Sequence, residues 1–213
     1  MTSSRTQASD RSLRRGPRPR GTVRAALVAA GVELARSGGP DAVVLREVTR
    51  IVGVVPNAAY RHFAEREGLL AAVRDAAIGQ LAQRMADGMR RVRARRGTPT
   101  GARRRLRAVG QAYLDFARTE PGLFDTAFTA TDYHPPRAGN AEPGPFELLK
   151  AALDELGEAG LLEPARTLNV AYPTWATVHG LAVLFRGPLH SLSDRDKTRL
   201  EAQTLGFIEA SLS

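Results

Sequence analysis

Two short helical segments constrain this chain of 213 residues more than any other feature. A glycine ends the first segment, and a proline begins the second. The first segment runs from about Leu45 to Val52 and carries apolar residues on one face. Gly53 ends it, and Pro56 begins a second short segment at a first-turn position that needs no N–H. The second segment ends near Phe63 and has a polar outer face. This arrangement predicts a helix-turn-helix, which presents its second helix to the major groove of DNA.

Helical periodicity continues through the rest of the chain, and no alternating run of β-branched residues predicts a strand. A first helix is expected from Thr22, as its N-cap, to the stop at Ser37-Gly38-Gly39-Pro40. The fold class is therefore all-α. Further helices are expected over 65–95, 102–118, 121–130, 146–160, 165–187 and 194–211, with a linker at 97–101 and a mobile loop over 131–145. The expected domains are a disordered basic arm (1–20), a helix-turn-helix domain with a long connecting helix (21–96) and a second helical domain (102–213).

Charge is distributed unevenly along the chain. Residues 1–108 hold 23 Arg and 8 Asp or Glu, a net charge of +15, whereas residues 109–213 hold 8 basic and 14 acidic residues, a net charge of −6. This split favours a module that binds a polyanion joined to one that does not. A solvated basic surface in an arginine-rich protein is the alternative. Charge alone does not distinguish these two interpretations, so the sequence motif described below is needed.

Several classes of protein are disfavoured by what the sequence lacks. Without cysteine it has neither disulfides nor thiolate chemistry. The first 21 residues lack the apolar run of a signal peptide, and the apolar stretch 171–185 is too short to span a bilayer. We expect a cytoplasmic protein that does not enter the membrane.

A specific motif lies inside the helix-turn-helix. Gly53-Val54 is followed by Tyr60-x-His62-Phe63, and the next helix opens with Arg66-Glu67-Gly68-Leu69-Leu70. With these motifs, residues 22–70 resemble the DNA-binding domain of the tetracycline-repressor (TetR) family of transcription regulators. The resemblance implies a sequence-specific regulator that binds a double-stranded DNA operator.

The resemblance also implies roles for individual residues. Tyr60 and His62 would donate hydrogen bonds to phosphates, and Arg66 would make a charge contact where the family usually has lysine. Asn57 can pair with adenine, Ala58 can meet a thymine methyl, and Arg61 can pair with guanine or equally bind a phosphate. Phe63 is expected in the core. The expected DNA contacts are Thr22, Arg46, Pro56, Asn57, Ala58, Tyr60, Arg61, His62 and Arg66.

The sequence departs from the family at four positions. Val44 and Val55 stand where a Ser or Thr usually caps the two short helices, and loss of such a cap typically costs ~1 kcal/mol. Thr49 and Val52 replace small alanines at the contact between these helices. We therefore expect the helix-turn-helix domain, called the reading head below, to be less stable or somewhat altered, with the same fold.

The basic arm contains a second, weaker signal. Residues 15–21, RGPRPRG, resemble an AT-hook, in which arginines enter a narrow minor groove. A solvated tail with non-specific attraction to phosphate explains the same residues at least as well.

The second domain carries Trp175-x-x-x-His179-Gly180, in which Trp175 and His179 share a helix face. Residues 109–213 thereby resemble the WHG type of TetR-family C-terminal domain. The resemblance implies a homodimer through the last two helices and a cavity for a small-molecule effector. Dimerisation would place two reading heads about one DNA turn (~34 Å) or a small multiple apart on a roughly palindromic operator.

An effector cavity is implied by the family more than by the residues. Aromatic residues gather on successive helices with few charges near them, which favours an apolar or aromatic effector. Core packing is the more frequent role of such residues, and His179 is more often structural than a ligand anchor. The candidate lining residues are Tyr113, Phe116, Phe124, Phe128, Trp175 and His179.

Other functions are less well supported. No HExxH, GxSxG, phosphate-loop or dinucleotide motif appears, so neither an enzyme nor a cofactor is expected. Asp132 and His134 lack a third ligand for a metal site. A basic protein that coats DNA without reading it is the main alternative to a ligand-responsive repressor, and activation instead of repression stays open.

Overall fold

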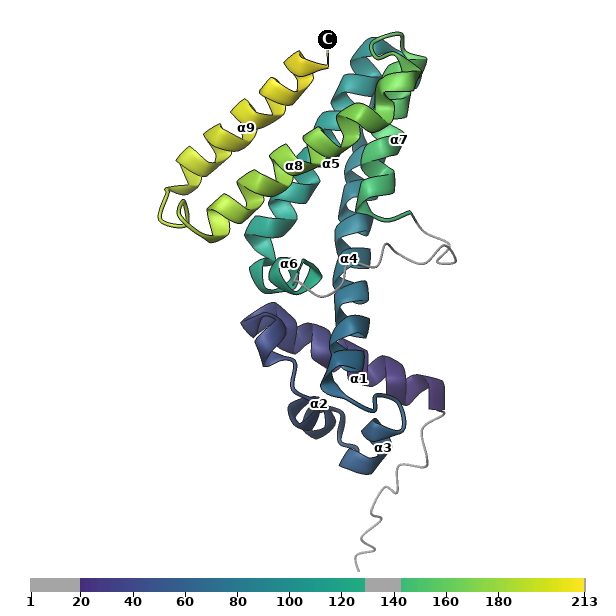
Figure 1. Cartoon of the computed structure of the whole chain (residues 1–213), viewed down its shortest axis with the longest axis vertical. Helices are drawn as coiled ribbons and strands as arrows, with labels where there is room; N and C mark the ends of the chain where they lie inside the picture. Colours follow the sequence, from purple (N-terminus) through teal and green to yellow (C-terminus); the bar gives the residue numbers. More distant parts are fainter. Residues whose placement is uncertain (1–19, 129–142, 213) are drawn as a thin grey trace, which may run out of the picture.

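The computed structural model describes residues 20–128 and 143–212. Within these residues the chain is all-α as predicted, without any strand (Figure 1). The α-helices are α1 (Arg20–Gly38), α2 (Leu45–Val52), α3 (Pro56–Tyr60), α4 (Arg66–Arg91), α5 (Pro99–Thr119), α6 (Pro121–Ala127), α7 (Pro145–Glu158), α8 (Thr167–Arg186) and α9 (Asp194–Ser211). Two 3-10 helices, η1 (Pro40–Ala42) and η2 (Pro164–Arg166), lie between them. The expected arm, apart from Arg20, and most of the expected loop over 131–145 lie outside the described residues.

The helices form an elongated molecule with two ends (Figure 1). One end contains α1, α2, α3 and the start of α4, and the other contains α5, α7, α8 and α9. The 26 residues of α4 join the two ends and span about 39 Å at ~1.5 Å per residue. Helix α6 lies between the ends, in contact with α1, α4 and α5.

Most helix boundaries agree with the sequence patterns, and α2 has the bounds that were predicted. Five boundaries differ by three or more residues. Helix α4 ends at Arg91, short of the expected Arg95, and α6 ends at Ala127, short of the expected residue 130. Helix α1 begins at Arg20, so Thr22 lies in its first turn and is not the N-cap. Helix α3 ends at Tyr60, before Phe63. Helix α5 begins at Pro99 inside the expected linker, because Thr98 is an N-cap whose Oγ1 accepts a hydrogen bond from the Gly101 N–H at 3.2 Å.

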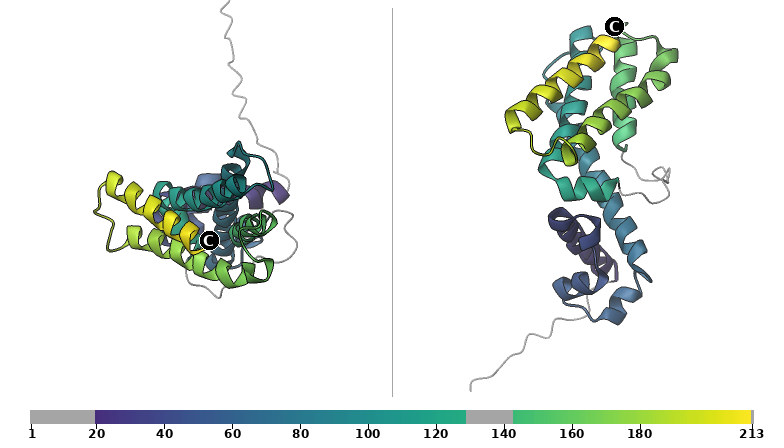
Figure 2. Two further views of the ribbon diagram at one scale, coloured as in Figure 1. Left: turned by 90° about the horizontal axis from the view of Figure 1, so that it is seen from above. Right: turned by 60° about the vertical axis from the view of Figure 1, so that its left-hand side comes forward.

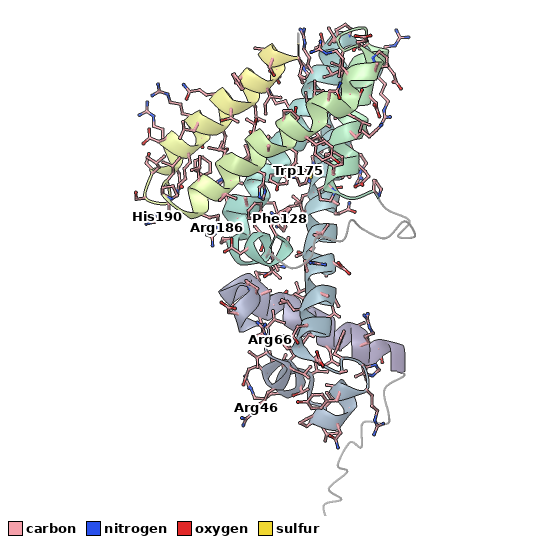
Figure 3. All side chains as sticks on the ribbon, in the orientation of Figure 1. Arg46, Arg66, Phe128, Trp175, Arg186 and His190 are labelled. Carbon is pink, nitrogen blue, oxygen red and sulfur yellow. The ribbon has the colours of Figure 1, made fainter. Side chains whose placement is uncertain are left out.

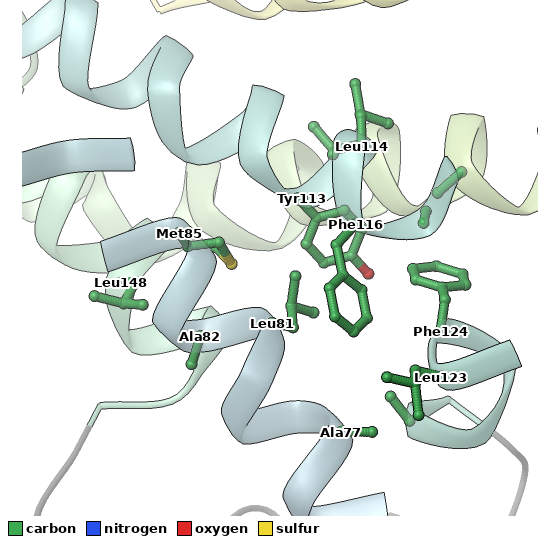
Figure 4. Packing of buried hydrophobic residues seen from close by; sticks show 14 of the residues in the cluster. Ala77, Leu81, Ala82, Met85, Tyr113, Leu114, Phe116, Leu123, Phe124 and Leu148 are labelled. Atoms are coloured by element: carbon green, nitrogen blue, oxygen red, sulfur yellow. The ribbon is translucent and has the colours of Figure 1, made fainter. Parts of the chain in front are cut away.

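One apolar core runs through the whole molecule along α4. The buried side chains of α4 recur every fourth residue: Leu69, Val73, Ala77, Leu81 and Met85. This spacing keeps them on one face of the helix, which contacts α1 at its lower end and α5 and α6 higher up. Figure 4 shows the upper part of this core, where Leu81 of α4 lies near Phe116 of α5. The connecting helix is therefore part of both halves.

Helix α6 sits directly on the C-terminal turn of α1. A Cβ atom added to Gly122 would lie 2.2 Å from the carbonyl oxygen of Ala35 and 2.7 Å from that of Arg36. Only glycine allows so close an approach between a side-chain position and a neighbouring backbone. The C-terminal half thus contacts the helix-turn-helix half through α6 as well as through α4.

Helices α8 and α9 lie side by side in an antiparallel pair (Figures 1 and 2). The expected cap of α9 is present, since Ser193 Oγ accepts a hydrogen bond from the Asp196 N–H at 3.2 Å. The pair packs on α5 with one face and leaves large apolar residues exposed, among them Val183 and Leu184 of α8 and Phe207 of α9. In the described parts of the chain, no helix has the length and hydropathy needed to cross a membrane.

Candidate nucleic-acid interface and aromatic cavity

The turn between α2 and α3 orients the second helix. Gly53 adopts the left-handed conformation (φ 72°, ψ 38°), and its N–H donates to the carbonyl oxygen of Thr49 at 2.9 Å. This conformation strains residues that have a Cβ atom, which explains the glycine. Ala59 and Phe63 are buried against the rest of the head, so the opposite face of α3 points outward. Phe63 is in the core, as predicted.

The structure places most of the expected DNA contacts on the surface of this end. On α3 and just after it, Pro56, Asn57, Tyr60 and Arg61 are exposed, and Ala58 and His62 are half-buried. Tyr60 is 55% exposed, a large value for an aromatic side chain that would otherwise pack in a core. Thr22 of α1 and Arg46 of α2 are also exposed, and Figure 3 shows Arg46 projecting from α2.

Arg66 is placed differently from the other expected contacts. Its Nε donates to the carbonyl oxygen of Val43 at 3.0 Å, and its Nη2 donates to that of Pro40 at 2.8 Å. These bonds hold the segment that leads into α2 against the start of α4. Arg66 therefore positions the reading head from within, and its contact with DNA stays a prediction.

The two missing helix caps are confirmed. Val44 and Val55 occupy the N-cap positions of α2 and α3 with extended backbones, and neither makes a side-chain hydrogen bond to its helix. Val55 is 69% exposed, so its side chain gains little from burial. The first N–H groups of α3 thus lack the side-chain acceptor that a Ser or Thr would supply.

Five of the six aromatic candidates meet in one cluster between α5, α6 and α8. Tyr113, Phe124, Phe128, Trp175 and His179 have ring centroids 4.9 to 6.3 Å apart in the contacting pairs. All eight pairs are tilted or edge-to-face, which aromatic quadrupoles favour. Trp175 and Phe128, both labelled in Figure 3, come from α8 and the end of α6.

A hydrogen bond joins two members of the cluster. The hydroxyl of Tyr113 lies 2.8 Å from Nδ1 of His179. Burial raises the pKa of Tyr113, and it lowers the pKa of His179, since the apolar surroundings disfavour the charged form of each. The pair is thus a neutral polar contact within an apolar cluster.

A small cavity lies beside this cluster. It is lined by Tyr113 and Trp175 and by apolar residues of α4, α5, α7, α8 and α9, such as Met85, Val178 and Leu205. Its volume of about 30 Å³ has room for one or two water molecules. A drug-sized ligand needs several hundred Å³, so such a ligand would require the surrounding helices to move apart.

Two aromatic residues are placed otherwise than expected. Phe116 is fully buried on the α4 side of α5, beneath Arg84, whose guanidinium lies 5.1 Å from the ring centroid. It does not line the cavity, and neither do Phe124, Phe128 and His179; of the six candidates only Tyr113 and Trp175 line it. Phe146 of α7 was not predicted, but its ring lies 5.8 Å from that of Trp175 and extends the cluster. In the sequence, Phe146 is a single aromatic residue at the start of an expected helix, and nothing in that pattern places it near Trp175.

A further contact that the sequence did not reveal joins the two halves. Glu120, at the junction of α5 and α6, accepts hydrogen bonds from Arg36 Nη1 and, at 2.7 Å, from Arg84 Nη2. Arg36 belongs to α1 and Arg84 to α4. The Glu120 side chain is 14% exposed, so both ion pairs are partly shielded from water. One carboxylate therefore links three helices at the point where α6 meets the reading head.

Helix α6 is also tied to the end of α8. Arg186 donates to both carboxylate oxygens of Asp125, at 3.1 and 2.5 Å, and this pairing raises the pKa of the guanidinium. No group of three or more His, Asp or Glu side chains among the described residues is placed to hold a metal ion. Asp132 and His134 lie outside those residues.

Two family models match the chain. Residues 27–73 match the model described as bacterial regulatory proteins, tetR family, and residues 106–205 match the model described as tetracyclin repressor-like, C-terminal domain. Together they cover more than half of the chain. The second description names no WHG type, so that detail stays a prediction. A search of the curated proteins finds no match.

Solved structures share the fold over nearly the whole chain. A protein with unknown function from Rhodococcus sp. RHA1 is 24% identical, with a TM-score of 0.62 over 92% of this chain and 97% of that one. A tetR-family transcriptional regulator from Streptomyces coelicolor is 22% identical, with a TM-score of 0.60 over 90% and 80%. A TetR variant from Acinetobacter baumannii AYE in complex with minocycline is 19% identical, with a TM-score of 0.56 over 92% and 96%.

Proposed function

Because the chain belongs to the tetR family of bacterial regulatory proteins, and is thus a DNA-binding transcriptional regulator, we propose that it is a homodimeric repressor. In this proposal it binds a roughly palindromic operator and is released by a small apolar or aromatic effector. The observation that carries the DNA-reading part is the outward face of α3, where Pro56, Asn57, Tyr60 and Arg61 are exposed together.

The contacts follow from the chemistry of these side chains. Asn57 reads adenine in the major groove, and Ala58 meets a thymine methyl. Tyr60 and His62 donate hydrogen bonds to phosphates on either side. Thr22 and Arg46 lie on the same end of the molecule and add backbone contacts, which position the head without specifying sequence.

A second copy of the chain covers the exposed face of α8 and α9. Val183 and Leu184 on α8 and Phe207 on α9 are 44 to 66% exposed, and burying them against a symmetric partner removes apolar area from water. Gly180 lies on α8, and apart from its own helix backbone and its two chain neighbours no described atom lies within 4 Å of its Cβ position. A small residue at this place lets a partner helix approach closely. The two-fold axis would set the spacing of two reading heads on DNA.

The effector binds where the aromatic cluster and the small cavity lie. Tyr113, Phe124, Phe128, Trp175 and His179 offer ring faces and one neutral hydrogen-bonding pair, which suits an apolar or aromatic molecule. The similar A. baumannii protein was solved in complex with minocycline, which supports a small-molecule ligand for this chain. Entry of a ligand expands the present 30 Å³ cavity by displacing Tyr113 and Trp175, which line it, and these two rings contact Phe128 at the end of α6.

Helix α6 carries the effect to the reading head. It bears Phe124 and Asp125, which face the cluster and α8, and its start packs on α1 at Gly122. Displacement of α6 therefore strains the contacts of Glu120 with α1 and α4. The effector lowers operator affinity by its differential affinity for the two conformers, commonly ~1–3 kcal/mol.

Selection of bound duplexes from a random DNA library tests the proposal, followed by titration of the best site at several salt concentrations. The expected result is an inverted repeat that is bound at least ~10³-fold more tightly than random DNA. Equal affinity for all sequences, lost steeply with salt, would instead establish a protein that coats DNA.

A further inference from the structure

The positive charge of the chain is concentrated in a segment that is not the reading head. Between Asp87 and Asp115 there are nine arginines and no acidic residue, a net charge of +9. Residues 20–87, which contain the helix-turn-helix, hold nine arginines and seven acidic residues, a net charge of +2. The sequence analysis attributed the positive charge of the first half to one DNA-binding module. In the structure, most of this charge lies in a segment outside the helix-turn-helix.

This arginine-rich segment lies at the far end of the molecule. It comprises the end of α4, the loop that follows and the start of α5, at the top of Figure 1, whereas α2 and α3 lie at the bottom. The right-hand view of Figure 2 agrees with this placement. The length of α4, about 39 Å, separates the two ends. A duplex bound under α3 therefore does not reach these arginines.

Three of the nine arginines are already engaged. Arg90 pairs with Asp87, Arg107 pairs with Glu209, and the buried Arg105 pairs with Glu155 at 2.5 Å. The other six are exposed and make no ion pair with any described residue. These six form the distal patch: Arg91, Arg93, Arg95, Arg96, Arg103 and Arg104. The neighbouring acidic groups are Glu155 and Glu158, which line a cleft with Arg96, and Glu209, which lines a small pocket with Arg103; Glu155 and Glu209 are paired with Arg105 and Arg107.

The loop that carries half of the distal patch is held in place. Arg105 donates from Nη1 to the carbonyl oxygen of Ala94 at 3.0 Å and from Nη2 to that of Arg95 at 3.3 Å. The loop also packs closely on α5, since a Cβ atom at Gly101 would lie 2.2 Å from the Arg95 carbonyl oxygen. These contacts present the patch beside the first turn of α5, which contains no acidic residue and whose dipole adds positive potential.

The chemistry of the patch selects its partner. All its cations are arginines, whose planar guanidinium groups suit phosphate oxygens. Residues 88–112 contain no aromatic side chain on which unpaired bases would stack. None of the large exposed apolar residues of the described chain lies in this segment, so nothing there anchors it in a bilayer. These features fit the backbone of a duplex better than a single strand or a membrane.

We propose that the distal patch binds the phosphate backbone of a second duplex DNA segment. The repressor dimer would then hold its operator at one end and contact neighbouring DNA, without sequence preference, at the other. This contact is separate from sequence reading by α3, so it can be tested independently of the proposed operator binding.

The test uses the full chain with the reading head disabled by Asn57→Ala, Tyr60→Ala and Arg61→Ala. In that background, Arg93→Gln, Arg95→Gln and Arg104→Gln are compared with a control of equal charge change: Arg166→Gln, Arg195→Gln and Arg199→Gln, all exposed. Binding to a random-sequence duplex is measured by fluorescence anisotropy at several salt concentrations. Thermal unfolding and light scattering verify that both proteins are folded and have the same oligomeric state.

We expect the patch substitutions to weaken duplex binding by about tenfold or more and to lower the salt slope by about 2 to 3, while the control keeps both values. Arg→Lys substitutions at the same three positions retain the charge and should retain most of the affinity. Equal binding by the patch and control variants would overturn the proposal. A loss of binding to phosphatidylglycerol vesicles with duplex binding unchanged would overturn it too. With an intact head, the patch substitutions should leave the selected operator sequence unchanged, which separates this result from a failure of the proposed function.

Discussion

The Tyr113 hydroxyl and Nδ1 of His179 lie 2.8 Å apart, which joins α5 to α8 by a polar contact inside an aromatic cluster. His179 is surrounded by the rings of Tyr113, Phe124 and Phe128. The contact is therefore sensitive to any change that places a charge on the imidazole.

This sensitivity predicts a dependence of stability on pH. Burial lowers the pKa of His179 below its usual value of about 6.5, so the unfolded chain binds more protons than the folded one just below that pH. The stabilisation is complete above pH ~6.5 and is lost as the pH falls toward the folded pKa. Thermal unfolding at pH 7.5 and 5.5 should show this loss for the wild type and a smaller one for His179→Asn. His190→Gln, at an exposed position, serves as the control, and an equal loss in all three proteins would rule out His179 as its source.

Glu120 should matter more to stability than its exposed neighbours. Glu120→Gln removes the charge that Arg36 and Arg84 share, and we expect a loss of about 1–2 kcal/mol in the free energy of unfolding. Glu33→Gln is a matched control, because Glu33 pairs with the same Arg36 at 3.5 Å but is 70% exposed. Urea denaturation compares the two variants. Equal effects would mean that the shielded position of Glu120 has no energetic importance.

The missing cap of α3 can be restored. Val55→Thr replaces a methyl group by a hydroxyl that can accept a hydrogen bond from the first turn of α3, and we expect a gain of ~1 kcal/mol. Val55→Ala shortens the side chain without adding an acceptor and should bring no gain. Chemical denaturation measures both. A gain with Val55→Ala as large as with Val55→Thr would contradict the capping explanation.

Enlarging Gly180 should impair dimerisation. A leucine at this position projects from the exposed face of α8 and holds a partner helix away, so the dimer dissociation constant should rise by about tenfold or more. Sedimentation equilibrium measures the change. Gly79→Leu on α4 is the control, because that glycine is also free of contacts within 4 Å but lies outside the proposed interface. A dimer that tolerates Gly180→Leu would place the interface elsewhere.

Base and phosphate contacts on α3 should respond differently to substitution. Asn57→Ala should relax the preference at one adenine of the operator by about 1–3 kcal/mol, because it removes a pair of hydrogen bonds to that base. Tyr60→Phe should weaken binding uniformly across sequences, because it removes a hydrogen bond to a phosphate. Repeating the library selection with each variant gives the comparison. A change in the selected sequence with Tyr60→Phe alone would reverse the two roles.

The sequence predicted the features that depend on local chemistry. Leu45 to Val52 has the predicted bounds because the apolar period and Gly53 act within a few residues. The aromatic cluster was also largely foreseen, since Trp175 and His179 lie one helical turn apart. The spacing of three residues from Tyr113 predicts a shared face for Phe116, but the packing of α4 on α5 buries its ring beneath Arg84 instead.

Contacts between distant residues escaped prediction. Arg66 donates hydrogen bonds to carbonyl groups more than 20 residues earlier in the chain. Glu120 pairs with Arg36 and Arg84, which also lie far from it in the sequence. The hydrophobic periodicity of the sequence does not indicate which distant polar residues pair with each other. The start of α5 was missed for a local reason: proline and glycine in GTPTG suggested a linker, whereas Thr98 and Pro99 together form an N-terminal cap.

The uninterrupted length of α4 has a mechanical consequence. A helix of about 39 Å that is packed at both ends behaves as a lever, so a rotation of about 5° at its upper end displaces its lower end by roughly 3 Å. That displacement equals about one base-pair step along a DNA strand, ~3.4 Å. A shift in the packing around the cavity, too slight to alter the fold, is thus enough to move a reading head out of register with its half-site.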